Sequence, residues 1–392
     1  MTETGLPQIL LTPGPTQVPP DVLQAISQPV IHHRTAAFRE IFSELGTLLQ
    51  HVFCTDHPVL TLAGSGTTAF EAAAVSLACP GQRAVTCANG KFSERWQDLY
   101  ATYGVEQERV DVPWGEAIDP ARVEEALARS GATVVTLVHS ETSTATASDV
   151  RSIAEIVHRH DALLIVDGIT SVAALPLEMD AWSVDCVVCG SQKALMLPPG
   201  LGFVALGPRA LHRLGAVDGL PAFHLDLRRW LSAYRKGDVP YTPPVNLIRG
   251  QRVALQRVVD QGLEQVWKDT SQRASATRAA LATMGLALIS VAPSDSVTGA
   301  FYPTVGDGVI DDGVFRSVLR DHHGIHIAGG QSGRLGDLAR RAFRISHMGF
   351  IDAAQTRQGL EAIETEFIAA GAAIQAGVAL PAFDAVMGEG NA

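Results

Sequence analysis

Two residues that could do chemistry follow apolar runs typical of buried strands. Lys193 stands in "GSQKALMLPPGLG", just before a stiff Pro-Pro-Gly turn, and Asp167 ends the run "ALLIVD". A carboxylate at the tip of a buried strand is costly unless it is paired. The chain between the two residues is long enough for one crossover, so both are predicted at one edge of a sheet. Taken alone, Lys193 could also be an ordinary loop residue.

A third feature is the turn in "LTLAGSGTTAFEAAAVSLA", which predicts a strand followed by a helix. The free N–H groups of a helix N-terminus, together with the hydroxyls of Ser65 and Thr67, can bind a phosphate. The spacing matches neither G-x-x-x-x-G-K-[ST] nor G-x-G-x-x-G, so neither a nucleoside triphosphate nor a dinucleotide is indicated. An ordinary turn capped by Ser65 or Thr67 is the alternative.

The three features together fit pyridoxal 5′-phosphate (PLP). This cofactor needs a cup for its phosphate, a carboxylate beside its pyridine nitrogen and a lysine that holds its aldehyde as a Schiff base. A metal is not expected. Cys186 and Cys189 would point to opposite faces of a strand, and the histidine pairs lack a partner at metal spacing.

The elements that must position these residues form an alternating pattern between about residues 59 and 206, which predicts a mostly parallel α/β sheet. Helices lie between the strands, several of them opened by Asp or Pro. The predicted strands are Val59–Ala63, Ala84–Cys87, Arg109–Val112, Val134–His139, Leu163–Asp167, Cys186–Cys189 and Phe203–Leu206, and the predicted helices are Thr67–Ala78, Phe92–Tyr103, Pro120–Ala128 and Val150–His160.

The pattern breaks near Pro240–Pro244, after which one long helix is expected from about Gln251 to Met284. Beyond it, the strand-like stretches "LALISVA", "TGAFYPT" and "RAFRIS" and helices near Asp311–His322 and Asp352–Ala373 predict a smaller α+β unit. We therefore expect an N-terminal segment (1–20) that contributes to the active site, a large cofactor-binding domain (21–260) and a small C-terminal domain (261–392).

The charge composition of the chain limits the classes of partner that it is expected to bind. The net charge of −11 and the pI near 5.6 argue against nucleic acid or an anionic membrane as the main partner. The N-terminus lacks the basic and apolar regions of a signal peptide, and no apolar run is long enough to cross a membrane. A cytoplasmic enzyme is expected.

The order of motifs resembles the class V aminotransferases of the fold-type I PLP-dependent enzymes, within them the alanine–glyoxylate and serine–pyruvate aminotransferases. The resemblance runs from "LLTPGPTQVPP" through "ANGKFSERW" and "VHSETST" to "YTPPV" and "FRISHMG". It implies Lys193 as the Schiff-base lysine and proton carrier, Asp167 beside the pyridine nitrogen, and Arg344 on the substrate carboxylate. It also implies cofactor contacts by Ser65, Gly66, Thr67, Phe92, Thr142 and Gln192, and substrate contact by Gly14.

A homodimer with its active sites at the subunit interface is also implied, because "YTPPV" resembles a segment that reaches the partner's phosphate site. Thr242 matches the hydroxyl donor there. The tyrosine usual three residues earlier is Val239 in this chain, and Tyr241 is the residue that could replace it. Thr67 stands where some members carry histidine, and its hydroxyl can still donate to a phosphate.

The resemblance implies transfer of an amino group from alanine or serine to glyoxylate or pyruvate, by a ping-pong mechanism. Gln331 and Arg34 are candidates for selecting the side chain of the donor. An (S)-ureidoglycine–glyoxylate aminotransferase is the main alternative, and pyridoxamine or aminoethylphosphonate are donors of other relatives. Cysteine desulfurases of this fold need a cysteine nucleophile on a late loop. That activity is disfavoured here because all five cysteines precede residue 190. A binding module without catalysis is disfavoured because Lys193 and Asp167 are both present.

Overall fold

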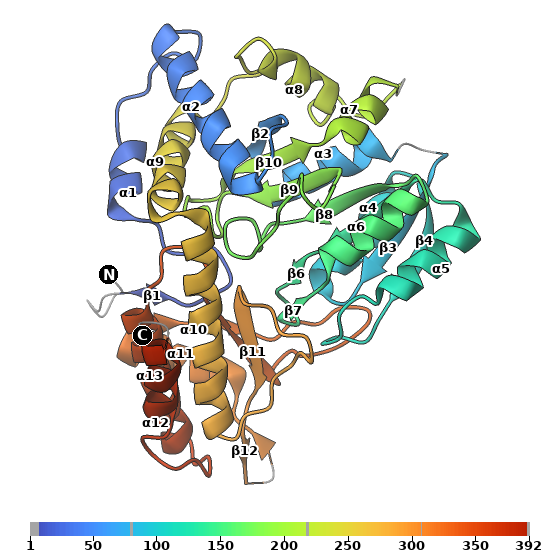
Figure 1. Cartoon of the computed structure of the whole chain (residues 1–392). Helices are drawn as coiled ribbons and strands as arrows, with labels where there is room; N and C mark the ends of the chain where they lie inside the picture. Colours follow the sequence, from blue (N-terminus) through green and yellow to red (C-terminus); the bar gives the residue numbers. More distant parts are fainter. Residues whose placement is uncertain (1–7, 79–80, 217–218, 307, 390–392) are drawn as a thin grey trace.

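A seven-stranded sheet forms the centre of the larger unit (Figure 1). The computed structural model describes residues 8–78, 81–216, 219–306 and 308–389. The sheet order is β2-β10-β9-β8-β5-β3-β4, and only β10 runs antiparallel to its neighbours. The predicted α/β class is thus confirmed. The strands are β2 (Val59–Gly64), β3 (Arg83–Ala88), β4 (Glu106–Asp111), β5 (Val134–Val138), β8 (Leu163–Asp167), β9 (Cys186–Gly190) and β10 (Gly200–Leu206).

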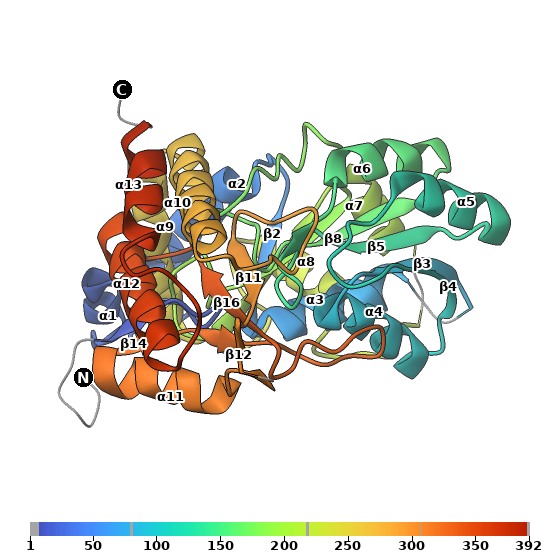
Figure 2. The same ribbon diagram turned by 90° about the horizontal axis from the view of Figure 1, so that it is seen from below.

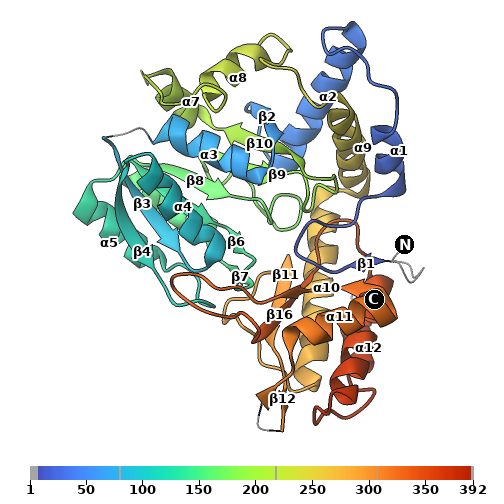
Figure 3. The ribbon, with the colours of Figure 1, turned by 180° about the vertical axis from the view of Figure 1, so that it is seen from behind.

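Helices cover both faces of this sheet (Figures 2 and 3). One face packs against α1 (Pro20–Ile26), α2 (Ala36–Phe53), α5 (Pro120–Ser130), α6 (Val150–Arg159) and α9 (Val245–Gln261), and the other against α3 (Gly66–Leu77), α4 (Lys91–Thr102), α7 (Pro208–Gly215) and α8 (Leu227–Tyr234). The predicted opposite facing of the two cysteines of β9 is confirmed, since Cys189 joins the first core and Cys186 the second.

Local signals explain where several helices begin. The side chains of Asp119 and Asp149 accept backbone N–H groups at the starts of α5 and α6, and Pro120 occupies the first turn of α5. The central strands β5, β8 and β9 are buried along their whole length, as parallel strands covered on both faces must be. Their continuous apolar runs are the reason that the sequence predicted them within a few residues.

The prediction of a single long helix from about Gln251 to Met284 is wrong. Two helices occupy this stretch, α9 and α10 (Leu263–Thr283), and they meet at Gly262. Gly262 has φ +84°, a left-handed value that ends α9 and that glycine adopts most easily. Helix α10 then runs from the large unit into the small one (Figure 1).

The smaller unit has its own apolar core beneath a three-stranded sheet of β11 (Val297–Phe301), β16 (Ala342–Ser346) and β15 (Ala328–Gly329). Helices α11 (Asp312–His323), α12 (Ala353–Ala369) and α13 (Ala379–Glu389) pack around this core. The chain start joins it, because β1 (Ile9–Leu10) pairs with β14 (Ile325–His326). The remaining short pairs are β6 (Ser140–Glu141) with β7 (Thr146–Ala147) and β12 (Thr304–Val305) with β13 (Gly308–Val309).

The strand expected at "LALISVA", residues 286–292, is not formed. Its backbone donors are divided between two partners: Ile289 N–H donates to Gly299 O of β11 (3.0 Å), and Val291 N–H donates to Gly115 O in a loop of the large unit (3.0 Å). Only an isolated bridge joins Leu288 to Ala300. The apolar residues here serve packing rather than a sheet: Leu286 and Leu288 join the core of the small unit, and Ile289 clusters with Leu338 and Trp114 between the units.

A search of the described helices finds none that is both long and apolar enough to cross a membrane. Within the same residues, no group of three or more His, Cys, Asp or Glu side chains is arranged to hold a metal ion. Cys79 lies outside the described residues, as do the chain ends and the short gaps. The predicted domain boundaries stay a prediction.

Candidate active site

Lys193 and Asp167 meet at the carboxyl ends of β9 and β8. The two strands are parallel, with Asp167 opposite Val188, and Lys193 follows the end of β9 by three residues. Both residues line one cavity at this edge, as the sequence predicted. The N-terminal segment lies against the lysine. Lys193 Nζ donates to Pro13 O (2.5 Å), and Thr16 Oγ1 donates to Lys193 O (2.7 Å).

Burial shifts the protonation of both groups toward the neutral form. Burial lowers the pKa of Lys193 to about 8, and the nearby charge of Arg344 acts in the same direction. Burial raises the pKa of Asp167 to about 7, opposed by a hydrogen bond from Ile169 N–H (2.9 Å). Such a pair of perturbed groups in one cavity is typical of an active site.

The turn before α3 forms the expected cup at the same cavity. Ser65 caps the helix by accepting from Thr67 N–H (3.3 Å), and Gly66 and Thr67 line the cavity. A Cβ on Gly190 would lie 2.9 Å from Gly66 N, so strand β9 and the helix start approach too closely for a side chain. Gln192 reaches this place with a buried Oε1 that has no hydrogen-bond partner.

Helix α4 supplies Phe92 and a residue that the sequence analysis missed, Arg95. Arg95 Nη1 donates to Thr67 Oγ1 (3.2 Å), and its guanidinium carbon lies 5.2 Å from the Phe92 ring centroid. Among the described residues, no carboxylate lies within ion-pair distance of Arg95. A cation without a protein counter-charge therefore stands at the cup. The helical spacing from Phe92 to Arg95, three residues, was the available signal.

Glu141 is a second residue that sequence analysis missed. It is fully buried, and it accepts from Phe92 N–H (3.1 Å), Ser93 N–H (2.7 Å) and both the N–H (3.1 Å) and the hydroxyl (2.6 Å) of Ser143. These bonds fix the first turn of α4 beside the cavity and satisfy N–H groups that the helix leaves free. The charge of Glu141 also favours the neutral form of Asp167.

Arg344 on β16 enters from the small unit and is 5% exposed. Its Nε–H and one Nη2–H donate to Gly329 O (3.0 and 2.8 Å), and one Nη1–H donates to Thr142 O (2.9 Å). A guanidinium has five N–H donors, so two remain for another acceptor. Burial lowers the pKa of Arg344 to about 10, which leaves it cationic at neutral pH.

The remaining predicted residues divide into two groups. Thr142 lines the cavity, and Gly14 touches it closely, since a Cβ on Gly14 would lie 2.3 Å from Lys193 Nζ. Tyr241 and Thr242 lie elsewhere: Tyr241 packs against Phe223, His224 and Trp230, and Thr242 is exposed. Within one chain, the structure therefore does not bring them to Lys193.

The two candidates for donor selection differ in what surrounds them. Arg34 pairs with Asp238 (2.6 Å) and is not among the residues of the cavity. Gln331 begins a loop of the small unit just after the strand that holds Arg344 in place, and its buried Oε1 has no partner. The structure thus ties Arg34 to an ion pair and leaves Gln331 as the freer of the two.

Comparison with known proteins places this geometry in a family. The sequence profile described as Aminotransferase class-V matches residues 9–348. The L-aspartate–glyoxylate aminotransferase of Paracoccus denitrificans is 33% identical over 94% of this chain and 93% of its own. The serine–glyoxylate aminotransferase of Methylorubrum extorquens is 31% identical, covering 87% and 86% of the two chains.

A solved structure agrees with the fold over nearly the whole length. The ureidoglycine–glyoxylate aminotransferase of Bacillus subtilis superposes with a TM-score of 0.90 and 26% identity, and the match covers 98% of each chain. Both units of the present structure are therefore accounted for by one known architecture.

Proposed function

The chain belongs to the class V aminotransferases, which are PLP-dependent transaminases, and from that premise we propose that it moves an amino group from alanine or serine to glyoxylate or pyruvate by a ping-pong mechanism. The observation that carries the proposal is the cavity itself. It holds a lysine with a lowered pKa and a buried acid, and Arg344, with two N–H groups free, is bonded to Thr142 in its lining. The two amino acids of this proposal are small, and each carries an α-carboxylate that Arg344 can bind.

The residues present fit PLP. Arg95 has no ion-pair partner among the described residues, the close approach of Gly66 and Gly190 keeps helix α3 open at its start, and Gln192 lines the same cavity, where its amide NH₂ group can donate. We propose that Ser65, Gly66, Thr67, Gln192 and Arg95 hold the phosphate. Asp167 would lie against the pyridine nitrogen, and Phe92 and Thr142 would contact the ring. Bound PLP supplies an aldehyde that takes up the amino group and a ring that withdraws electrons.

The chain's own groups then divide the work. Lys193 Nζ, with its pKa lowered to about 8, has a substantial neutral fraction near physiological pH and can accept a proton from the substrate α-carbon. Arg344 can bind the α-carboxylate with its two free N–H groups, and its bonds to Gly329 and Thr142 hold it in one orientation. Pro13 and Gly14 lie against the lysine and limit the space on that side.

The choice of acceptor is supported by the relatives. Two that resemble this chain along most of its length, and the B. subtilis enzyme, are named glyoxylate aminotransferases. The donor differs among them, being aspartate, serine and ureidoglycine. A ureidoglycine donor is the second candidate, and the B. subtilis enzyme named for that donor shares this fold along nearly the whole chain.

A homodimer with shared sites forms part of the proposal. Thr242 is exposed and does not line its own chain's lysine cavity; it lies beside the exposed Val30, and its neighbour Tyr241 packs on the exposed Phe223. A partner chain that covers this surface would bring a hydroxyl donor, together with Tyr241, to the other site.

A half-reaction screen tests the function. The PLP-loaded protein is mixed with each donor singly (alanine, serine, aspartate, ureidoglycine and pyridoxamine), and the visible absorbance of the cofactor is followed. We expect rapid loss of the band with alanine or serine and its return on addition of glyoxylate. If both fail while ureidoglycine reacts, the first-ranked donor is wrong and the second candidate replaces it.

The role of Arg344 is tested in the same assay. Arg344→Lys should keep the cofactor band but raise the donor KM by about 10- to 100-fold, because a bidentate contact with the carboxylate is lost. Arg357→Lys, a change of the same type at an exposed pair with Asp384, is the control. An unchanged KM in Arg344→Lys would return this residue to a purely structural role.

A further inference from the structure

A loop of the small unit lies against the large unit beside the active site. Residues 330–341 connect β15 to β16 and reach across to α4 (Figure 3). The loop is internally bonded: Gly330 N–H donates to Ala342 O (2.7 Å) at its base, and Gly333 N–H donates to Gly336 O (2.9 Å) at its tip. It is thus an ordered excursion with a defined tip.

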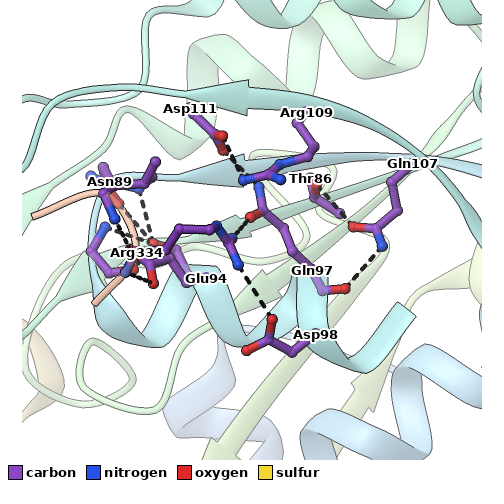
Figure 4. A network of polar contacts seen from close by, with 12 residues as sticks. Thr86, Asn89, Glu94, Gln97, Asp98, Gln107, Arg109, Asp111 and Arg334 are labelled. Atoms are coloured by element: carbon purple, nitrogen blue, oxygen red, sulfur yellow. Dashed lines mark hydrogen bonds and ion pairs between the residues drawn. The ribbon is translucent and has the colours of Figure 1, made fainter. Parts of the chain in front are cut away.

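Glu94 of α4 holds that tip (Figure 4). The side chain is 3% exposed, and it accepts from Arg334 N–H (2.7 Å), Leu335 N–H (2.9 Å) and Trp114 Nε1–H (3.3 Å). A buried carboxyl group is costly unless its oxygens are satisfied, and here two backbone donors from another unit satisfy them.

The tip fits closely against the indole of Trp114. A Cβ on Gly333 would lie 2.5 Å from the Trp114 ring and 2.8 Å from the Glu94 carboxylate, and one on Gly336 would lie 2.7 Å from the same ring. Outside this contact, the Arg334 side chain donates to Gln97 Oε1 and to Asp98 Oδ1 (Figure 4). Backbone and side-chain contacts therefore fix the loop from both sides.

The loop and Glu94, which contact each other, are each adjacent to residues of the active site. At the base of the loop, Gly329 O accepts two N–H groups of Arg344. At the other end, Glu94 lies two residues after Phe92 in the first turns of α4, whose N–H groups Glu141 binds. One buried carboxylate therefore links the wall that carries Arg344 to the wall that carries Phe92.

We propose that Glu94 is a positioning residue, which anchors loop 330–341 on α4 and so holds Arg344 ready for the carboxylate of amino and 2-oxo acids. The inference rests on the proposed role of Arg344. A released tip would let the loop base move, and the Gly329 carbonyl would no longer hold the guanidinium in one orientation. Substrate binding would weaken, while the phosphate cup on α3 would be unaffected.

The test uses two variants that act from opposite sides. Glu94→Gln keeps the volume but sets an NH₂ group against a loop N–H donor. Gly333→Ala adds a methyl group that collides with the Trp114 ring and the Glu94 carboxylate, and so displaces the tip while Glu94 keeps its charge. In each PLP-loaded variant we expect the KM of donor and of acceptor to rise about tenfold or more, the loss expected for a charge-assisted hydrogen bond, with a smaller change in kcat.

Readouts besides activity separate positioning from general damage. Amide hydrogen exchange in residues 330–341 should accelerate in both variants, while the PLP dissociation constant stays near that of wild type. Asp98→Asn, which touches only the Arg334 side chain at 3.4 Å, is the matched control and should change neither.

Two results would overturn the inference: unchanged exchange in the loop, or a released loop with unchanged KM. A wild-type protein that reacts with no amino donor would instead overturn the proposed function on which the inference rests.

Discussion

At the scale of single residues, the site buries ionisable groups where water cannot solvate their charged forms. Lys193 and Asp167 are both buried, and burial pushes each toward its neutral form without a cofactor. Burial also lowers the pKa of Arg344, to about 10, but Arg344 stays cationic at neutral pH and donates to two backbone carbonyls. The charged form of Asp167 therefore destabilises the protein while no cation lies beside it. A cationic ring nitrogen next to Asp167 would remove this cost, which favours binding of the cofactor.

The pH dependence of stability tests this for Asp167. Its pKa rises from 3.8 in the unfolded chain to about 7 in the folded protein, so the folded state binds more protons between these values. The stability of the cofactor-free protein should therefore fall as pH rises from about 4 to 7. Asp167→Asn does not titrate, and it should be more stable than wild type at pH 8, by at most on the order of 4 kcal/mol.

Denaturant unfolding of the cofactor-free proteins at pH 5 and pH 8 measures the difference. The advantage of Asp167→Asn should be larger at pH 8, and wild type should bind PLP more tightly than the variant. Glu155→Gln removes an exposed carboxylate on α6 and is the control. An advantage that does not grow with pH would contradict the assignment of the buried charge to Asp167.

At the scale of elements, the site depends on how strands and helices end. Asp167 and Lys193 come after parallel strands, and the cup comes from the start of α3, so three element ends converge at one edge. Helix ends also decide the connection between the units. Gly262 stops α9 with a left-handed φ, and α10 begins at the next residue and leads into the small unit.

Gly262→Ala tests that helix break. No heavy atom lies within 4 Å of a Cβ built at Gly262, so the cost is the left-handed backbone alone, about 1 kcal/mol of unfolding free energy. Gly46→Ala is the matched control, because Gly46 lies inside α2 with equally open space and no positive φ. It should stabilise the protein by roughly 0.5–1 kcal/mol. Chemical denaturation measures both changes in unfolding free energy. If Gly262→Ala also stabilised the protein, the break between α9 and α10 would not need glycine.

At the scale of the whole molecule, one chain presents an incomplete set of the predicted cofactor contacts. Lys193, Asp167 and the cup share a cavity, whereas Tyr241 and Thr242 lie on a different surface with the exposed Phe223. The small unit contributes Arg344 through a strand and holds it through loop 330–341. The proposed homodimer would complete the phosphate site by exchange of one segment.

Mixing inactive subunits tests the exchange. Lys193→Ala chains should be inactive, and Thr242→Ala chains should be nearly so at low PLP. A mixed dimer contains one site with Lys193 from one chain and Thr242 from the other, so activity should reappear on mixing. Gln192→Ala mixed with Lys193→Ala is the control, because these residues share one chain's cavity and no intact site can form. Equal behaviour of the two mixtures would contradict a shared site.

The sequence by itself determined the sheet and the chemistry at its edge. Continuous apolar runs specified the central strands β5, β8 and β9, because strands buried on both faces tolerate few polar residues, whereas the edge strand β4 is mostly polar. Asp167, Lys193 and the turn at Ser65 follow those runs directly, so local order in the chain was enough to predict them in one place. Their motifs also pointed to the family that the comparisons show.

Only the tertiary structure decided what depends on contacts between distant segments. Glu141 fixes α4 and Glu94 anchors a loop some 240 residues later in the chain, and neither contact leaves a local pattern. For Arg95, which reaches the cup, the helical spacing from Phe92 was the one local signal. The stretch at 286–292 shows the converse, because its strand-like apolar residues pack into the small unit's core and, at Ile289, between the units without forming a strand. Periodicity reports which residues are buried, but partners for buried polar groups are set by the approach of whole elements, which no short stretch encodes.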